Sequence, residues 1–469
     1  MSGMSYDLVV IGGGPAGQKA ALCGAKAGLS TLIVDREPHI GGECVHRGTI
    51  PSKTLRESAV YLAGMRQRSA QLLQGDIGPG TVIKSLMRRL DQVLKAHEEV
   101  MEGQIGQHAI GHVQGRARFL SPHEIEITRI DGTRSSIEAA TVVIATGSRP
   151  RQPAEIPIDH EHILDSDSIL EMIYLPKTLV VLGAGVIACE FATVFQALGV
   201  DVTIVDKGDR PLRFLEAELC DEFVRAFERA GGRFIPGAQA ENVQAGVGGA
   251  TVELSNGETL SCEKALVALG RTASLKGLTL ENAGVQTTER GYIAVDEHFA
   301  TNVQHIYAAG DVVGPPALAT SSMEQGRRAV LHALGRPCPG DWDTIPIGIY
   351  TIPEMAGVGL TEAQAIERHG AASVGRASFR EIARGQINGS TEGLLKLVCD
   401  PSGERLLGAH VVGEGATELI ALAQMALIGG MGPEVFVENV FNFPTLAEAY
   451  RVAALDVAYA KSAAASVAA

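Results

Sequence analysis

Apolar and polar positions repeat one pattern twice along the chain, and each copy predicts a βαβ unit. Within residues 6–35 the apolar run YDLVVI leads into a glycine-rich turn, an alanine-rich helical segment and a second run, TLIVD, which ends at Asp35. Residues 178–206 repeat the order of strand, glycine turn, helix and strand, and there the final acid is Asp206. Two such units predict two dinucleotide-binding modules of the doubly wound α/β type.

The first glycine turn points to a specific chemistry. Gly12, Gly14 and Gly17 form G-x-G-x-x-G directly after the predicted strand. Such glycines permit a tight turn, let a pyrophosphate approach the backbone, and allow the helix to pack closely on the strand. The helix N-terminus adds free N–H groups, and Asp35 lies where a carboxylate can accept bonds from ribose hydroxyls. We therefore predict that these residues bind a dinucleotide.

The second glycine turn leaves the choice of nucleotide open. Gly183 and Gly185 keep two of the three glycine positions, and an alanine takes the third. Asp206 favours an unphosphorylated ribose because its charge repels a 2′-phosphate. Lys207 and Arg213 follow at once, with Arg210 between them, and any of these cations could pair with a 2′-phosphate or simply be a solvated surface charge.

Outside these units the apolar spacing predicts further helices and strands. Residues 81–104 carry apolar side chains three and four positions apart, including Leu86, Leu90 and Val100, which predicts a long helix packed on a core. The last part of the chain alternates strand-like runs, LLKLVCD and RLLGAHVVG, with helical segments near 415–428 and 445–460.

Composition and charge exclude several classes of function. The 469 residues suggest about two to four domains, and a net charge of -14 at pH 7 argues against a nucleic-acid or anionic-membrane partner. The seven cysteines are scattered without a CxxC pair, which predicts no metal site and no secreted disulfide framework. We find no targeting signal or membrane span, and we expect a cytoplasmic protein.

Four further motifs, in order, resemble those of the flavoprotein disulfide reductases. They are GGECVHRGTIPSK (41–53), VVIATGSRP (142–150, with Thr146 and Gly147), IYAAGDV (306–312) and FPTLAEAY (443–450). The resemblance covers nearly the whole chain. It implies bound FAD, NAD(H) and NADP(H) as substrates, and a homodimer that could assemble further. It also implies that Thr146, Gly147 and Asp311 lie against the FAD.

The same resemblance implies how the chain divides. Residues 1–150 and 275–340 are expected to form an FAD-binding domain, with an NAD(P)-binding domain inserted at 151–274. Residues 341–469 would then form an α+β dimerisation domain.

Two positions depart from the family pattern. The redox loop of these reductases carries two cysteines, whereas this chain keeps Cys44 and has Thr49 in the second position. A hydroxyl cannot form a disulfide, so a dithiol relay is excluded here. At the C-terminus, Phe443 stands before Pro444 where the family has its general-acid histidine, and no histidine follows His410.

Both losses also occur in one subgroup of the family, the soluble, Si-specific pyridine nucleotide transhydrogenases. This chain resembles them further in residues 345–354, 374–387 and 447–455. The resemblance implies reversible hydride transfer between NADPH and NAD⁺ through FAD in a ping-pong cycle. Two alternatives stay open at this point: an NAD(P)H oxidase or quinone reductase (diaphorase), and a non-catalytic nucleotide-binding protein.

Three residue roles follow from this resemblance. Lys53, in the intact IPSK sequence, is expected beside flavin N5, paired with Glu190, and both are predicted to be catalytic. Arg271 is expected to border the nucleotide ribose. Cys44 is interpreted as a small inherited residue without a redox role.

Overall fold

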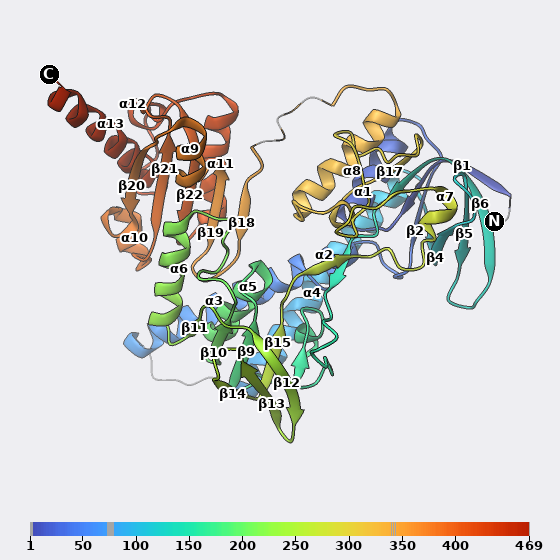
Figure 1. The fold of residues 1–469 in the computed structure, drawn as a ribbon, viewed down its shortest axis with the longest axis horizontal. Helices are drawn as coiled ribbons and strands as arrows, with labels where there is room; N and C mark the ends of the chain where they lie inside the picture. Colours follow the sequence, from blue (N-terminus) through green and yellow to red (C-terminus); the bar gives the residue numbers. More distant parts are fainter. Residues whose placement is uncertain (1–2, 73–78, 339, 341, 343, 469) are drawn as a thin grey trace.

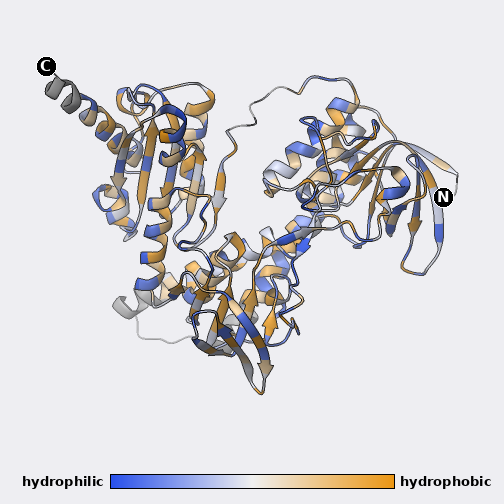
Figure 2. Ribbon diagram, in the orientation of Figure 1, coloured by the Kyte–Doolittle hydropathy of each residue, from blue (hydrophilic) through white to orange (hydrophobic). Residues whose placement is uncertain are grey.

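The computed structural model describes residues 3–72, 79–338, 340, 342 and 344–468, and its elements gather in three regions (Figure 1). In each region apolar residues concentrate on the strands and on the helix faces that cover them (Figure 2). Within the described part of the chain, none of the helices combines the length and apolar character that a membrane crossing requires.

The first region is built on a mixed sheet in the order β3-β2-β1-β6-β5-β4, and β17 also pairs with β6. In β1, Leu8 and Val10 belong to the core on one face, while Val9 and Ile11 belong to the core on the other. Burial on both faces explains why this strand is a continuous apolar run. The strands are β1 (Met4–Ile11), β2 (Thr31–Asp35), β3 (Gly111–Gln114), β4 (Arg116–Phe119), β5 (Glu124–Thr128), β6 (Arg134–Ile144) and β17 (Ile306–Ala308).

Two helices cover the sheet of this region, and three more follow β2 and extend towards the second region. Helix α1 (Pro15–Lys26) follows β1 and packs against α8 (Ala319–Ala333), which returns after β17. The loop after β2 carries α2 (Gly42–His46), α3 (Thr49–Leu72) and α4 (Pro79–Gln107). Helix α4 confirms the predicted long helix and buries Leu86 and Leu90, but Val100 is 58% exposed, so its predicted place in the core was wrong. The same helix buries Ile105 further on, so Val100 is on its solvent-facing side.

The second region repeats the doubly wound plan. Its five parallel strands have the order β11-β10-β9-β15-β8, covered by α5 (Val186–Ala197) and α6 (Ala217–Arg229). An antiparallel sheet packs beside it, and the paired strands β7 (Ser148–Pro150) and β16 (Arg271–Ala273) join the two regions. The other strands are β8 (Ile163–Leu164), β9 (Thr178–Leu182), β10 (Asp201–Val205), β11 (Arg233–Ile235), β12 (Ala240–Gly246), β13 (Gly249–Leu254), β14 (Thr259–Cys262) and β15 (Lys264–Val267).

The C-terminal region is an α+β unit around an antiparallel sheet in the order β18-β19-β22-β21-β20. Its elements are β18 (Ile347–Ile349), β19 (Met355–Gly359), β20 (Ser373–Ser378), β21 (Leu394–Cys399) and β22 (Leu406–Val412), with α9 (Glu362–His369), α10 (Ala383–Asn388), α11 (Ala416–Ile428), α12 (Val435–Glu438) and α13 (Glu448–Ala468). Among them, β21, β22, α11 and α13 confirm the two predicted strands and the two predicted helices. The fold is therefore the predicted one: two doubly wound α/β units and an α+β unit.

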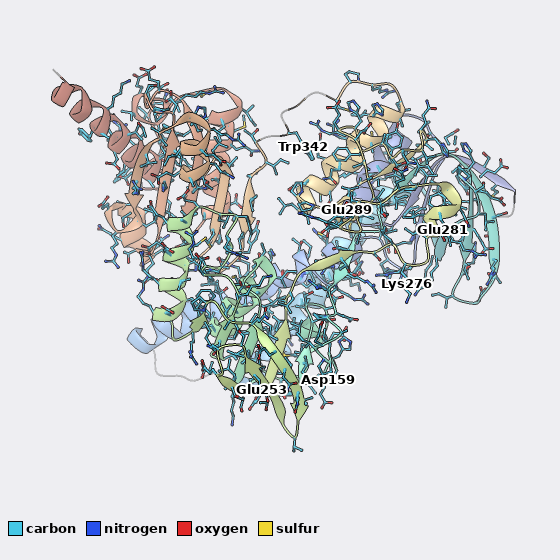
Figure 3. All side chains as sticks on the ribbon, viewed as in Figure 1. Asp159, Glu253, Lys276, Glu281, Glu289 and Trp342 are labelled. Atoms are coloured by element: carbon cyan, nitrogen blue, oxygen red, sulfur yellow. The ribbon has the colours of Figure 1, made fainter. Side chains whose placement is uncertain are left out.

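The tryptophan that follows α8 packs on the first region. Trp342 has the Arg328 guanidinium of α8 5.1 Å from its ring and the Phe299 ring at 5.7 Å (Figure 3). A cation and an aromatic edge thus hold its indole against this region.

A buried ammonium joins the second and third regions. Lys396, on β21, is fully buried, and its Nζ lies 2.9 Å from Glu216, 2.8 Å from Glu218 and 2.5 Å from Glu362. Arg376 donates a second set of bonds to Glu218. The lysine thus neutralises carboxylates from both regions at once.

Removing this ammonium should destabilise the protein. We expect Lys396→Met to lower the apparent free energy of unfolding by about 3–5 kcal/mol, because it leaves the buried carboxylate of Glu216 without its cation. Denaturant unfolding measures the change. Arg233→Met, which removes an exposed pair with Glu258, is the control and should cost about 1 kcal/mol or less. Equal losses in the two variants would contradict the buried role.

The same network predicts acid sensitivity. The hydrogen bonds from Arg376, with those from Lys396, hold the pKa of Glu218 down to about 2. An unfolded glutamate titrates near pH 4.3, so this stabilisation is complete above about pH 5 and lost as the pH falls towards 2. Unfolding midpoints measured across this window should drop, and more steeply in the wild type than in Glu218→Gln. Parallel pH profiles would contradict this assignment.

Candidate active site

The first glycine loop presents bare backbone at the end of β1. Gly12 has φ +107, and a Cβ on it would lie 2.3 Å from the Ala145 carbonyl oxygen. A Cβ on Gly17 would lie 1.9 Å from the Gly12 carbonyl oxygen, so strand and helix touch here. Gly14 is the N-cap of α1 and offers no side-chain cap. The loop and helix end can therefore receive a phosphate group.

Asp35 ends β2 and holds this loop. It is buried, and its oxygens accept hydrogen bonds from the Gly13 amide at 2.5 Å and the Glu37 amide at 2.9 Å. Each carboxylate oxygen has a further lone pair that can accept from a ribose hydroxyl. That bond remains a prediction.

Several polar groups around the loop lack a partner in the described structure. Gly42, at the start of α2, approaches Gly14 so closely that a Cβ on it would lie 2.8 Å from the Gly14 Cα. Near these turns the Thr146 hydroxyl, the Ser321 hydroxyl and one Glu43 carboxylate oxygen are buried without a hydrogen-bond partner among the described residues. Buried polar atoms ordinarily have partners. The bare loop and these atoms fit a long polar cofactor such as FAD.

Asp311 and Arg271 belong to one hydrogen-bonded chain. The Ser148 hydroxyl donates to Asp311 at 2.6 Å, and Arg271 donates to the Ser148 hydroxyl at 2.8 Å and to its carbonyl at 2.9 Å. Gly147, with φ +66, shapes the turn before Ser148. Arg271 thus ties β16 to β7, and its predicted contact with a nucleotide ribose remains a prediction.

Lys53 and Glu190 meet as the sequence predicted. Lys53 is on α3 and Glu190 on α5, 137 residues apart, and their Nζ and Oε2 atoms are 2.6 Å apart. Glu190 is buried, and its other oxygen accepts from the Tyr350 amide at 2.9 Å. The Lys53 ammonium also lies 5.0 Å from the centre of the Tyr350 ring.

Helix α2 carries the Cys44 thiol and α3 begins with the Thr49 hydroxyl, at the two positions where the family has thiols. All seven cysteines, Cys44 included, are free. Burial raises the pKa of the Cys44 thiol, although the Thr49 side chain and the Lys53 ammonium oppose this shift. Cys44 is therefore a neutral thiol at neutral pH and a weak nucleophile.

The second glycine loop repeats the first with one difference. Gly183 has φ +105, and a Cβ on it would lie 2.6 Å from the Ala268 carbonyl oxygen. A Cβ on Gly185 would meet nothing within 4 Å, so the loop is open there. Asp206 accepts from the Ala184 amide at 2.9 Å and the Gly208 amide at 2.7 Å. It fixes two turns, as Asp35 fixes the first loop.

The cations after Asp206 differ in exposure. Lys207 and Arg213 are exposed, and Arg210 is half-buried. A Cβ on Gly208 would lie 2.9 Å from Asp206 Oδ1 and 3.0 Å from Arg213 Cζ, so these two groups flank one small turn. Burial raises the pKa of the Cys220 thiol, and the charge of Arg210 opposes this shift.

Residues 6–326 match the family described as pyridine nucleotide-disulphide oxidoreductase, and residues 345–454 match its dimerisation domain. The chain belongs to this family. Its members carry FAD and use a pyridine nucleotide. As a member without the second redox cysteine, it has to move electrons without a disulfide.

Named relatives span nearly the same length as this family member. It is 42% identical to the soluble pyridine nucleotide transhydrogenase of Mycobacterium bovis (strain BCG / Pasteur 1173P2) over 453 residues, covering 96% of this chain and 97% of the relative. The protein of that name from Vibrio vulnificus (strain YJ016) is 37% identical over 457 residues, with coverages of 96% and 97%.

Solved structures of the family agree with this fold. LpdA from Mycobacterium tuberculosis is 30% identical with a TM-score of 0.88. The HOCl-induced flavoprotein disulfide reductase RclA from Escherichia coli is 25% identical with a TM-score of 0.87. Each comparison covers 96% of this chain and 99% of the solved one.

The turn after β10 should set nucleotide preference. We expect Arg213→Gln to weaken binding of NADP⁺ relative to NAD⁺ about fivefold, because one charge-assisted bond to the 2′-phosphate is lost. Asp206→Asn should shift the ratio about fivefold the other way, because repulsion of the phosphate is removed. Titration of each oxidised variant with both nucleotides measures the ratio.

Arg225→Gln, which removes an exposed i,i+3 pair on α6, is the control and should leave the ratio unchanged. Equal losses for both nucleotides in the Arg213 variant would mean that this residue only shapes the loop.

Proposed function

We propose that this protein is a soluble pyridine nucleotide transhydrogenase, which transfers hydride reversibly between NADPH and NAD⁺. One observation carries the proposal. Thr49 replaces the cysteine that would form a disulfide with Cys44, while the ion pair between Lys53 and Glu190 is present. The 42% and 37% identical relatives named for this activity support it.

The proposed FAD site uses the first glycine loop. Gly12, Gly14 and Gly17 would admit the pyrophosphate, and Asp35 would accept from a ribose. The buried Thr146 hydroxyl has no partner among the described residues, which supports placing residues 146–148 and 311 against the FAD. When bound, FAD supplies the chemistry: it takes hydride from one nicotinamide and returns it to another.

Lys53 and Glu190 act as a pair in this proposal. The ammonium, held by a buried carboxylate at 2.6 Å, offers a fixed positive charge where a reduced flavin gains negative charge. The side chains need not rearrange during turnover, because Glu190 is already held by its hydrogen bond from the Tyr350 amide.

One nucleotide site serves both substrates in this proposal. Gly183 and Gly185 admit the pyrophosphate, Asp206 suits an unphosphorylated ribose, and Lys207 and Arg213 suit a 2′-phosphate. Opposite charges around one turn support successive binding of NADPH and NAD⁺.

The proposal includes a homodimer in the cytoplasm, with domains divided at 1–150 and 275–340, 151–274 and 341–469. The dimerisation-domain match supports a dimer, and the name "soluble" given to the relatives supports the location. Large apolar side chains exposed in the last region suit a partner subunit: Met425 (64%), Ile428 (51%), Val440 (98%) and Phe443 (66%).

An anaerobic assay tests the activity. NADPH is mixed with the purified flavoprotein and an NAD⁺ analogue whose reduced form absorbs at its own wavelength. We expect sustained reduction of the analogue, without a long-wavelength thiolate–flavin band, because Cys44 is neutral. Cys44→Ser should keep at least about half of the rate.

Other outcomes would change the assignment. Bleaching of the flavin without reduction of the analogue would point to oxygen or a quinone as the acceptor. Reduction of lipoamide would contradict the role given to Thr49 and Phe443. Flavin that neither NADH nor NADPH reduces would favour a non-catalytic protein.

A further inference from the structure

Tyr350 lies where the C-terminal region meets helices α3 and α5. It lies in the turn between β18 and β19, and its ring faces the Lys53 ammonium of α3 at 5.0 Å. Its amide donates to Glu190 of α5 at 2.9 Å. One residue of the C-terminal region therefore touches both members of the ion pair.

A second set of bonds holds the tyrosine itself. Its hydroxyl is hydrogen-bonded to the Thr417 side chain, and Thr417 donates to Glu354 at 2.8 Å. Glu354 is buried and lies 3.0 Å from Arg56 of α3, one turn beyond Lys53. The tyrosine is thus contacted at its amide and at its hydroxyl while its ring lies beside the ammonium.

The turn after Tyr350 is anchored as well. The Ile352 amide donates to the Thr193 hydroxyl of α5 at 3.2 Å, and Arg56 donates to the Thr351 carbonyl at 3.3 Å. These bonds hold the turn that carries the ring against both α3 and α5.

We propose that Tyr350 is a positioning residue, whose ring holds the Lys53 ammonium against Glu190 and so sets the reduction potential of the bound flavin. An aromatic face attracts a cation and excludes water from one side of it. A less screened ammonium stabilises negative charge on a neighbouring group more strongly. The inference rests on the proposed FAD site, but it does not depend on which acceptor takes the electrons.

The test is the reduction potential of the bound flavin in the holoenzyme. Tyr350→Leu removes the ring, and we expect the reduced form to lose about fivefold in relative stability. For a two-electron couple this corresponds to a potential about 20 mV more negative. Tyr350→Phe keeps the ring and should stay within about 5 mV of wild type. Tyr350→Met is a second ring-free variant, if Tyr350→Leu fails to fold.

A double variant identifies the route of the effect. In a Lys53→Met background, Tyr350→Leu should shift the potential no further, because the ammonium through which the ring acts is gone. Tyr174→Leu is the matched control: its ring lies 4.7 Å from the Lys264 ammonium elsewhere, and its loss should leave the potential unchanged.

Two results would overturn the proposal. One is an unchanged potential in both ring-free variants, and the other is an equal shift with and without Lys53. A wrong transhydrogenase assignment would give a different result. Hydride transfer between nucleotides would then be missing, whereas the flavin potential of each variant could still be measured and compared.

Discussion

The ion pair between Lys53 and Glu190 is the contact on which the arrangement of the site depends. It joins α3 to α5 at 2.6 Å, with the carboxylate buried. A buried carboxylate without its cation is strongly unfavourable, so the two helices are held in one relative position. Tyr350 of the C-terminal region contacts both members of the pair, so this region is fixed against the same two helices.

Backbone, more than side chains, forms the two glycine loops. Close approaches at Gly12, Gly17 and Gly183 leave no space for a Cβ, and each loop is held from behind by an aspartate that accepts amide bonds. The same solution appears twice in one chain. What differs is the third position of the glycine pattern, which is Gly17 in the first loop and Ala188 in the second.

The family's second redox centre is absent from this chain, and the rest of the site is consistent with that loss. Thr49 cannot carry electrons, and burial keeps Cys44 protonated. Phe443 offers no proton and is largely exposed. In the proposed function, only the nucleotide side of the flavin remains for entry and exit of electrons.

The sequence by itself determined the two βαβ units, the glycine turns and the absence of a disulfide, because these depend on local patterns and on which atoms a side chain has. It also predicted the pairing of Lys53 with Glu190, through resemblance to relatives. Tertiary structure alone decided that Asp206 holds two turns, that Val100 lies outside the core, and that Tyr350 faces Lys53. These contacts join residues far apart in the chain, and their distances depend on how whole domains pack, which no local pattern records.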